Sequence, residues 1–418
     1  MSLFTTDSLA LTTRDSCAVY PWQNQRPAPP LGPVLGIDHL SGRGRFAFDP
    51  WTLYERHVIR APSMLVMGQI GNGKSTLVKT YCRRQILANR QAFVLDPKGE
   101  YGAFATLLRI PVLRLYPGGT IRVNPLDPGP FGLVNEDRQL LNQQRLALMR
   151  ALLASAVSRP PTQAESNALE EAIIEQDEIY GSDLLLSHVV DAMLNPSQTM
   201  ASRLVTTTDT LAREIRDGAY GLRRLVKGDL KGMFDGPTNI NLTLDGNGAI
   251  IDLSAVYGQD ALGPVMAAAS TWLMHAISAS KRKKLLVLDE AWAVLANPSV
   301  VAWLQGVNKL ARSLAVSLVI VMHRISDLSS QSESSSASSK QATGFLADTE
   351  TQVIFRQPDA ERQNLSQVLA LSSREISFVT NMPPFHALWR IGKERALVQH
   401  IVTREEMIMA DTDSAMVE

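Results

Sequence analysis

Cysteine is scarce in this sequence, and neither sign of charge is in excess. The 418 residues include 2 cysteines, Cys17 and Cys82. Two thiols cannot build a disulfide framework, and no CxxC spacing indicates zinc, so a reducing compartment is the simplest interpretation. Lys plus Arg and Asp plus Glu number 41 each, so any contact with nucleic acid must come from a local basic patch.

Long apolar runs and an export signal are also lacking. The chain begins with a polar and acidic segment, whereas a signal peptide would be basic and then apolar. No unbroken apolar stretch approaches the ~20 residues that a membrane span requires. We therefore expect a cytoplasmic protein that reaches a membrane only through partners.

Short apolar runs alternate with helical patterns along most of the chain. The runs lie at residues 64–67, 92–95, 249–253, 285–288, 317–322 and 352–355. They are typical of a parallel sheet covered on both faces, although periodicity alone does not separate them from pieces of buried helix. Polar residues at their C-terminal ends favour strands. We predict an α/β fold with a parallel-rich sheet and helices on both faces.

The same patterns suggest how the chain is divided. Residues 46–130 and 248–402 are predicted to form the two parts of the sheet-containing core. Residues 131–247 lack a strand pattern and show apolar residues at helical spacing, so we expect a mostly helical insertion there, with a hairpin near residues 234–244.

Three other segments are expected to lack regular structure. Residues 1–45 are rich in proline and are predicted to form a flexible arm, either an extended tail or a strap over a neighbouring subunit. The serine-rich residues 329–343 are expected to form a mobile loop within the core. Residues 403–418 are interpreted as a C-terminal tail.

A phosphate-binding pattern follows the first apolar run. The sequence GQIGNGKS at residues 68–75 fits GxxxxGK[ST] and lies between a predicted strand and a predicted helix. Its glycines let successive N–H groups converge on phosphate oxygens, and the helix adds a partial positive charge. Lys74 is expected to reach the β- and γ-phosphates, and Ser75 to bind Mg²⁺. The candidate nucleotide-binding residues here are Gly68, Gly71, Asn72, Gly73, Lys74, Ser75 and Thr76.

An apolar run that ends in two acids supplies the second half of such a site. Asp289 and Glu290 directly follow the run at residues 285–288. Asp289 is expected to hold Mg²⁺ through water, and Glu290 to orient and deprotonate the attacking water. Acids follow other predicted strands as well, at Asp96 and Asp252. Two adjacent carboxylates in a chain with a phosphate-binding loop nevertheless indicate ATP hydrolysis and motor work in preference to a small-molecule kinase.

Three further residues are candidates for catalysis. His323 follows the run at residues 317–322, where a polar residue lies beside the γ-phosphate in many motor ATPases. The alternative is an ordinary histidine at a strand end. Arg312 and Arg324 are candidates for a finger that completes a neighbouring subunit's site, although surface arginines are common.

The segment DPKGEY at residues 96–101 gives the sequence a narrower resemblance. It resembles the FtsK/HerA superfamily and, within it, the motor domain of conjugative and type IV secretion system ATPases (the fourth VirB component and TraC-like proteins). Shorter motifs agree, namely FDP at 48–50, NPL at 124–126, GDLKGMFDG at 228–236 and DEAW at 289–292. The resemblance covers residues 46–402.

This resemblance implies a RecA-like P-loop NTPase core that forms hexamers, with ATP between subunits and an arginine donated in trans. By position, Arg312 matches the finger-bearing helix of the family, and Lys98 and Glu100 would lie beside the nucleotide. The family usually has glutamine at the position of His323. The resemblance also implies a motor at the inner face of the cell membrane, with membrane-embedded secretion or conjugation channel proteins as partners.

Two basic groups are candidates for contact with DNA. The cluster KRKK at residues 281–284 follows a predicted helix, and helix capping with solubility is the simpler alternative to a DNA contact there. The other group would follow phosphates without reading sequence if it faces a central pore. It comprises Arg213, Arg216, Arg223, Arg224, Lys227 and Lys231. Few aromatic residues interleave with it, so base stacking is not expected.

The sequence therefore predicts an ATP-hydrolysing hexameric motor that powers conjugative DNA transfer or type IV secretion. A free HerA-like DNA translocase is the alternative from the same superfamily. A nucleotide-gated assembly scaffold with slow hydrolysis is the alternative from another class. DNA-stimulated hydrolysis with a strong salt dependence would favour the translocase.

Overall fold

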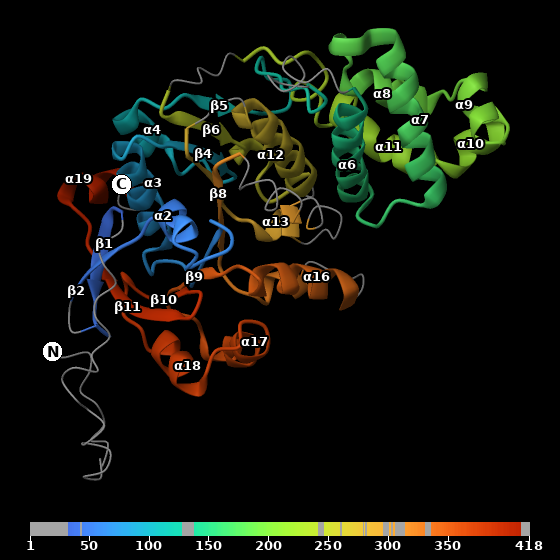
Figure 1. The fold of residues 1–418 in the computed structure, drawn as a ribbon. Coiled ribbons are helices and arrows are strands. Elements are labelled where there is room, and N and C mark those ends of the chain that lie inside the picture. The colour runs from blue at the N-terminus through green and yellow to red at the C-terminus, as the bar shows by residue number, and fades with distance from the viewer. Residues whose placement is uncertain are drawn as a thin grey trace, which may run out of the picture.

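Figure 1 shows a computed structural model in which helices flank a large sheet and a further group of helices lies beside it. The structure describes residues 32–410, except 42–43, 128–137, 241–245, 260, 279, 281, 296–300, 302–303, 306–313 and 331–335. Among the described residues, no helix is both long enough and apolar enough to span a bilayer.

Within the described residues the sheet has 11 strands, in the order β2-β1-β11-β10-β9-β3-β8-β7-β4-β6-β5. In chain order these are β1 (Val34–Asp38), β2 (Gly44–Ala47), β3 (Met64–Met67), β4 (Gln91–Asp96), β5 (Val112–Arg114), β6 (Gly248–Asp252), β7 (Lys284–Leu288), β8 (Val316–Met322), β9 (Thr351–Ile354), β10 (His386–Ile391) and β11 (Glu394–His400). From β9 to β5 all neighbouring strands are parallel, and β10, β11, β1 and β2 extend the sheet with antiparallel pairs.

The six apolar runs in the sequence are β3, β4, β6, β7, β8 and β9, so the predicted parallel-rich sheet is confirmed. Their side chains are buried on both faces. In β3, Leu65 and Met67 pack into one apolar core, whereas Met64 and Val66 pack into the other. This two-sided burial explains why these strands are continuously apolar and do not alternate with polar residues.

Helices cover each face of the sheet. One core contains residues of α2 (Pro50–Glu55), α3 (Lys74–Leu87), α4 (Gly102–Leu108) and α19 (Arg404–Ala410). The opposite core contains residues of α12 (Leu262–Ser278), α13 (Trp292–Leu295), α15 (Asp327–Ser330), α16 (Ser336–Ala347), α17 (Arg362–Gln367) and α18 (Ser373–Thr380). The fold is therefore a RecA-like layered core with helices on both faces.

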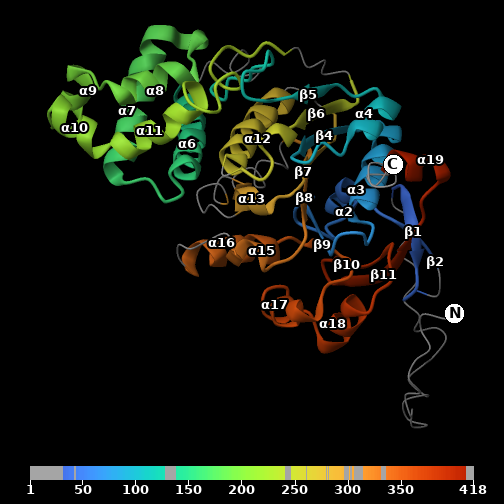
Figure 2. The same ribbon diagram turned by 180° about the vertical axis from the view of Figure 1, so that it is seen from behind.

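A group of helices between β5 and β6 extends to one side of the sheet (Figures 1 and 2). It comprises α6 (Arg138–Val157), α7 (Gln163–Tyr180), α8 (Leu186–Leu194), α9 (Gln198–Arg203), α10 (Thr208–Glu214) and α11 (Arg216–Val226). Its apolar residues join the same core as α12, so this group packs onto the molecule and is not tethered beside it. A hairpin was predicted near residues 234–244. Residues 234–240 form no strand, and residues 241–244 lie outside the described residues.

The antiparallel end of the sheet differs from the sequence-based expectation. Strands β1 and β2 include residues 34–38 and 44–47, part of which falls in the segment that we expected to be an irregular arm. The physical reason is that β1 pairs with a strand far away in the sequence. Gly36 of β1 lies opposite His400, the last residue of β11. A Cβ on Gly36 would lie 2.2 Å from the Gln399 carbonyl oxygen, so only glycine allows this approach. Residues 1–31 of the predicted arm lie outside the described residues.

The serine-rich segment at residues 329–343 was predicted to be a mobile loop, but part of it is helical. Residues 336–343 belong to helix α16, and its buried residues Ala342, Phe345 and Leu346 anchor it on the core. Apolar burial at one end of the helix outweighs the low packing capacity of its serines. Residues 331–335 lie outside the described residues, and residues 404–410 of the predicted tail form α19.

Candidate nucleotide-binding site

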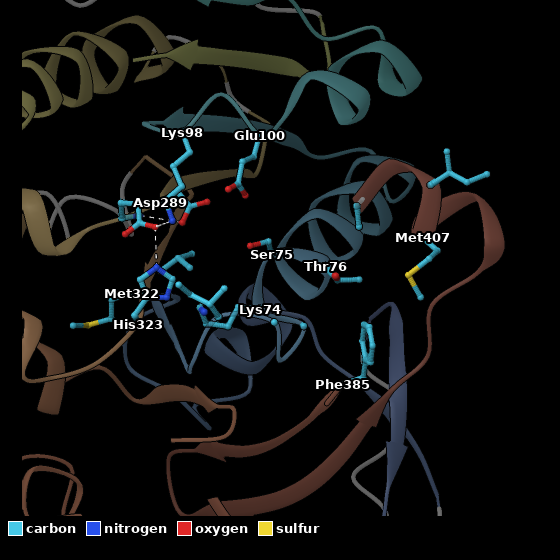
Figure 3. Close-up of a pocket in the computed structure, with 17 residues that line it drawn as sticks. Lys74, Ser75, Thr76, Lys98, Glu100, Asp289, Met322, His323, Phe385 and Met407 are labelled. Carbon is cyan, nitrogen blue, oxygen red and sulfur yellow. Dashed lines mark hydrogen bonds and ion pairs between the residues drawn. The ribbon is translucent and has the colours of Figure 1, made fainter. Parts of the chain in front are cut away.

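The carboxyl ends of the central parallel strands surround a pocket of about 590 Å³. Ligands bind at this edge in open α/β sheets. Figure 3 shows side chains from the β3–α3 loop, the segment after β4 and the ends of β7 and β8 around one space. The predicted site residues that line it are Gly71, Gly73, Lys74, Ser75, Thr76, Lys98, Glu100, Asp289, Glu290 and His323.

Three further predicted site residues do not line the pocket. Gly68 and Asn72 belong to the loop but are not among the described lining residues. Arg324 is exposed, and its backbone N–H donates to the Asp327 carboxylate at 2.9 Å, outside the pocket. Arg312 lies outside the described residues.

The loop at residues 68–75 has the backbone conformation that its glycines permit. Gly71 has φ 78° and Gly73 has φ 98°, in the left-handed region that favours glycine. Gly68 is required for a different reason, because a Cβ there would lie 2.4 Å from Cβ of Phe355. Asn72 supports the loop from within, since its amide donates to the Ile70 carbonyl at 3.2 Å.

Lys74 is buried at the start of α3, where its ammonium donates to the Gln69 carbonyl at 3.1 Å. Burial lowers the pKa of Lys74 to about 8, although the charges of Asp289 and Glu290 act in the opposite direction. A polyanion held by the loop would favour the charged ammonium, because opposite charges in a partly dry site stabilise each other.

Asp289 directly follows β7 and lines the pocket, where its side chain is half-buried. Burial, followed by the charges of Glu290 and Asp96, raises the pKa of Asp289 to about 7. The Tyr101 hydroxyl donates to its Oδ2 at 3.3 Å, and the backbone N–H of Glu290 donates to its Oδ1 at 3.0 Å. A nearby cation would offset the unfavourable charge at this position.

The donor set fits Mg²⁺ bound together with phosphates. The Ser75 hydroxyl and the Asp289 carboxylate both line the pocket, and both offer the hard oxygen ligands that Mg²⁺ prefers. Within the described part of the chain, no group of three or more His, Cys, Asp or Glu residues could hold a metal by itself. Mg²⁺ keeps several waters and shares its coordination with substrate phosphates, so one hydroxyl and one carboxylate from the protein fit it.

Glu290 is held by three side chains. Its Oε1 pairs with the Lys98 ammonium and lies 3.0 Å from Nε2 of His323, and its Oε2 accepts from the Trp292 indole at 2.6 Å. Its backbone has φ 49°, in a region that side chains rarely adopt and that often marks functional positions. The side chain is only 4% exposed, so these contacts fix the carboxylate beside Asp289.

Those contacts also set the protonation of Glu290. Burial alone would raise the pKa of this carboxyl group, but the hydrogen bonds and charges of His323 and Lys98 outweigh it and lower the pKa to about 2. Glu290 is therefore a carboxylate at neutral pH, which is the form that a general base requires.

The segment DPKGEY owes its conformation to its first residue. The Asp96 carboxylate accepts the backbone N–H groups of Gly99 at 2.9 Å, Glu100 at 3.2 Å and Tyr101 at 3.0 Å. This turn presents Lys98 and Glu100 to the pocket, opposite the phosphate-binding loop (Figure 3). The motif is thus a side-chain-stabilised turn that places one cation and one anion at the site.

Sequence reasoning missed several residues of this site. Trp292 was recognised only as part of a motif, although its indole binds Glu290 directly. Phe385, Met407 and Ile408 also line the pocket. They follow no nucleotide-binding pattern, and only the pairing of β10 with β9 and the packing of α19 on α3 bring them to the phosphate-binding loop.

Comparison with known proteins agrees with this fold. The family model described as "Helicase HerA, central domain" matches residues 58–267. VirB4 of Thermoanaerobacter pseudethanolicus is similar in structure, with a TM-score of 0.69 and 20% identity over 91% of this chain and 99% of that one. Plasmid coupling protein TrwB in complex with ADP and Mg²⁺ is similar with a TM-score of 0.57 and 15% identity over 82% of this chain and 86% of that one. A search of curated proteins gives no match.

Proposed function

Because the chain belongs to the family of the HerA helicase central domain, we propose that it is an ATP-hydrolysing hexameric motor that powers conjugative DNA transfer or type IV secretion. The observation that carries this proposal is the meeting of Lys74 and Ser75 with Asp289 and Glu290 in one pocket. The fold shared with VirB4 and with TrwB supports the choice of conjugation or secretion among motor functions.

In this proposal the phosphate-binding loop and its lysine bind the nucleotide. The N–H groups of the loop and the N-terminus of α3 attract the phosphates, and Lys74 neutralises them. Mg²⁺, held by Ser75 and Asp289, would neutralise the charge of the β- and γ-phosphates. Glu290 accepts the proton of the attacking water, and His323 and Lys98 keep Glu290 ionised and oriented.

A neighbouring subunit is proposed to complete the site. An arginine supplied in trans would stabilise the charge of the transferring phosphoryl group, as fingers do in other nucleotide hydrolases. Arg324 is exposed just beyond His323 and can extend from its own subunit, and Arg312 remains the other candidate. Hydrolysis would then require assembly of the subunits into the hexamer. Membrane-embedded channel proteins are the further partners that we propose.

Replacing Glu290 with glutamine tests the catalytic assignment. Glutamine keeps the size and can still accept from the Trp292 indole, but it cannot take a proton from water. We expect steady-state ATP hydrolysis to fall at least ~100-fold, while the affinity for a non-hydrolysable ATP analogue stays within about threefold. If the variant loses hydrolysis but keeps its biological activity, the protein would instead be a scaffold that assembles when it binds nucleotide.

A free DNA translocase of the HerA type is the second candidate, and a surface of the helical group favours it. On α11, Arg216 and Arg223 are exposed on either side of Tyr220, which is 51% exposed. Both guanidinium groups lie near its ring, at 5.8 Å and 6.0 Å from the centroid. Base stacking was not expected for this basic group from the sequence, but the exposed Tyr220 ring between two cations can combine stacking with phosphate contact.

Hydrolysis measured with and without DNA separates the two candidates. A translocase should hydrolyse ATP several-fold faster with single- or double-stranded DNA, and the stimulation should weaken steeply with added salt. The mass of the protein in solution with nucleotide should be measured in parallel. Hydrolysis that is indifferent to DNA would favour a secretion motor that depends on its membrane partners.

A further inference from the structure

Tyr101, the last residue of the DPKGEY segment, carries a hydroxyl that packing alone does not explain. The side chain is fully buried in the core that contains residues of α3 and α4. Its ring meets the Phe104 ring edge-on, with 5.7 Å between centroids, and a phenylalanine would fill this space equally well. A buried hydroxyl is costly without a hydrogen-bond partner, so its partner indicates what the tyrosine is for.

The partner of this hydroxyl is the acid that we propose for Mg²⁺. Tyr101 donates to Oδ2 of Asp289 at 3.3 Å, while Oδ1 of the same carboxylate accepts the backbone N–H of Glu290 at 3.0 Å. The bond from Tyr101 is long for an O–H···O contact, but its charged acceptor strengthens it. Each carboxylate oxygen thus has one donor, and together the two donors fix the orientation of Asp289.

A second buried side chain holds Tyr101 from the side of α3. Lys79 is fully buried, and its ammonium donates to the Glu100 carbonyl at 2.8 Å and lies 5.1 Å from the centroid of the Tyr101 ring. Burying an ammonium group is costly, and the carbonyl and the aromatic face both offset part of that cost. These contacts hold the end of the DPKGEY segment against α3.

Lys79 shares a face of α3 with the other residue that we propose for Mg²⁺. Ser75 and Lys79 are four residues apart, which is close to one helical turn. The Ser75 side chain lines the pocket together with Asp289. A chain of contacts therefore runs from Ser75 along α3 to Lys79, and from there through Tyr101 to Asp289.

This chain of contacts joins parts of the sheet that are not neighbours. Ser75 lies in the helix after β3, Asp289 follows β7, and the DPKGEY segment starts at the end of β4, while the strand order here is β3-β8-β7-β4. Adjacent strands are about 4.8 Å apart, so β3 and β7 are separated by roughly 10 Å, with β8 between them. Lys79 and Tyr101 add a side-chain link between these two strand ends.

We propose that Tyr101 is a positioning residue for Mg²⁺, which keeps the Asp289 carboxylate oriented toward the space that it shares with Ser75, and that Lys79 ties Tyr101 to α3. This inference rests on the proposed nucleotide site. Mg²⁺ demands near-ideal octahedral geometry, so a small displacement of one oxygen ligand weakens its binding. Groups that hydrogen-bond to metal ligands typically contribute about 10–100-fold in metal affinity.

Nucleotide binding with and without metal tests this role. The probe is a non-hydrolysable ATP analogue, and its affinity is measured by calorimetry in saturating Mg²⁺ and in EDTA. We call the ratio of the two affinities the magnesium factor. Tyr101→Phe removes the hydroxyl and keeps the ring. We expect its magnesium factor to be about tenfold smaller than that of the wild type, while its affinity in EDTA stays within about twofold.

Two further variants separate this role from a general effect on the core. Tyr81→Phe is the matched control, because Tyr81 is also a buried tyrosine of the same core, but its ring lies beside Phe48, at 5.9 Å between centroids. Its magnesium factor should equal that of the wild type. Lys79→Met removes the ammonium that holds Tyr101, and it should lower the magnesium factor about threefold or more.

The possible outcomes distinguish the inference from the proposed function. The inference is overturned if Tyr101→Phe has the magnesium factor of the wild type, or if it loses as much affinity in EDTA as in Mg²⁺. An equal decrease of the magnesium factor in Tyr81→Phe would also overturn it, because the effect would then belong to the core as a whole. If Mg²⁺ does not tighten binding by the wild-type protein, the metal assignment of the proposed function is wrong, and the inference with it.

Discussion

The most informative single residue outside the predicted set is Trp292, because it orients the carboxylate that the proposed mechanism needs. Its indole N–H donates to Oε2 of Glu290 at 2.6 Å, while Lys98 and His323 bind Oε1. A hydrogen bond to a charged group contributes roughly 1.5–3 kcal/mol, so its loss can change the reaction rate by about tenfold or more. Trp292 is therefore a positioning residue for Glu290.

Replacing Trp292 with phenylalanine keeps an aromatic side chain but removes the indole N–H, together with part of the ring volume. We expect kcat for ATP hydrolysis to fall about tenfold, with KM for ATP changed less than about twofold, because the contact acts on the general base and not on the nucleotide. The Trp292→His variant, which restores a ring N–H, should recover part of the rate. An unchanged kcat in Trp292→Phe would show that Lys98 and His323 orient Glu290 without it.

At the scale of elements, a buried histidine joins β10 to β11. The indole N–H of Trp389 donates to Nε2 of His400 at 3.0 Å, and Nδ1 of His400 lies 3.1 Å from the Phe385 carbonyl oxygen. With Nε2 accepting, the proton of the neutral ring belongs on Nδ1. Burial lowers the pKa of His400 to about 3, so the folded protein keeps this ring neutral.

The protein should therefore lose stability in mild acid through the β10–β11 hairpin. Between about pH 6.5 and pH 3 the unfolded chain protonates His400 and the folded chain does not, so the free energy of unfolding falls as the pH decreases. One such group contributes a slope of about 1.4 kcal/mol per pH unit. Urea unfolding at pH 6 and pH 5 measures how steeply the free energy of unfolding changes with pH. In His400→Gln this slope should be smaller than in the wild type by about 1.4 kcal/mol per pH unit. Equal slopes in the two proteins would contradict a neutral buried His400.

At the scale of the whole molecule, one buried arginine links the helical group to the sheet. Arg145 of α6 is 1% exposed, and it pairs with Asp177 of α7 at 2.6 Å. Its Nε also donates to the carbonyl of Leu126, in the segment that follows β5, at 3.0 Å. Removing this side chain would leave the Asp177 carboxylate nearly buried without its cation, at 11% exposure.

The Arg145→Met variant should lower the free energy of unfolding by about 3 kcal/mol, because one partner of a buried pair is lost. Arg150→Met on the same helix is the matched control. Arg150 pairs with Glu170 at 3.1 Å, but the two side chains are 42% and 47% exposed, so the expected loss is below ~1 kcal/mol. Urea denaturation of both variants at pH 7.5 gives the comparison, and similar losses would mean that Arg145 does not link the two parts.

The sequence by itself determined the parts of the protein that depend on local patterns. Two-sided burial leaves a continuous apolar run, so six of the seven strands in parallel pairs could be predicted, and only the short β5 was not. The phosphate-binding loop could be predicted because glycines at fixed spacing are needed for its backbone. Asp289 and Glu290 stood out for a similar reason, as two acids directly after a buried strand.

Only the tertiary structure decided the features that depend on distant partners. Residues 34–38 form strand β1 because they pair with the free edge of β11. No local pattern in these residues predicts that partner. The three contacts of Glu290 come from the segment after β4, the end of β8 and the start of α13. Phe385 reaches the phosphate-binding loop through the order of strands in the sheet. Such proximity depends on chain topology, which local residue patterns do not encode, and it is what completes the site.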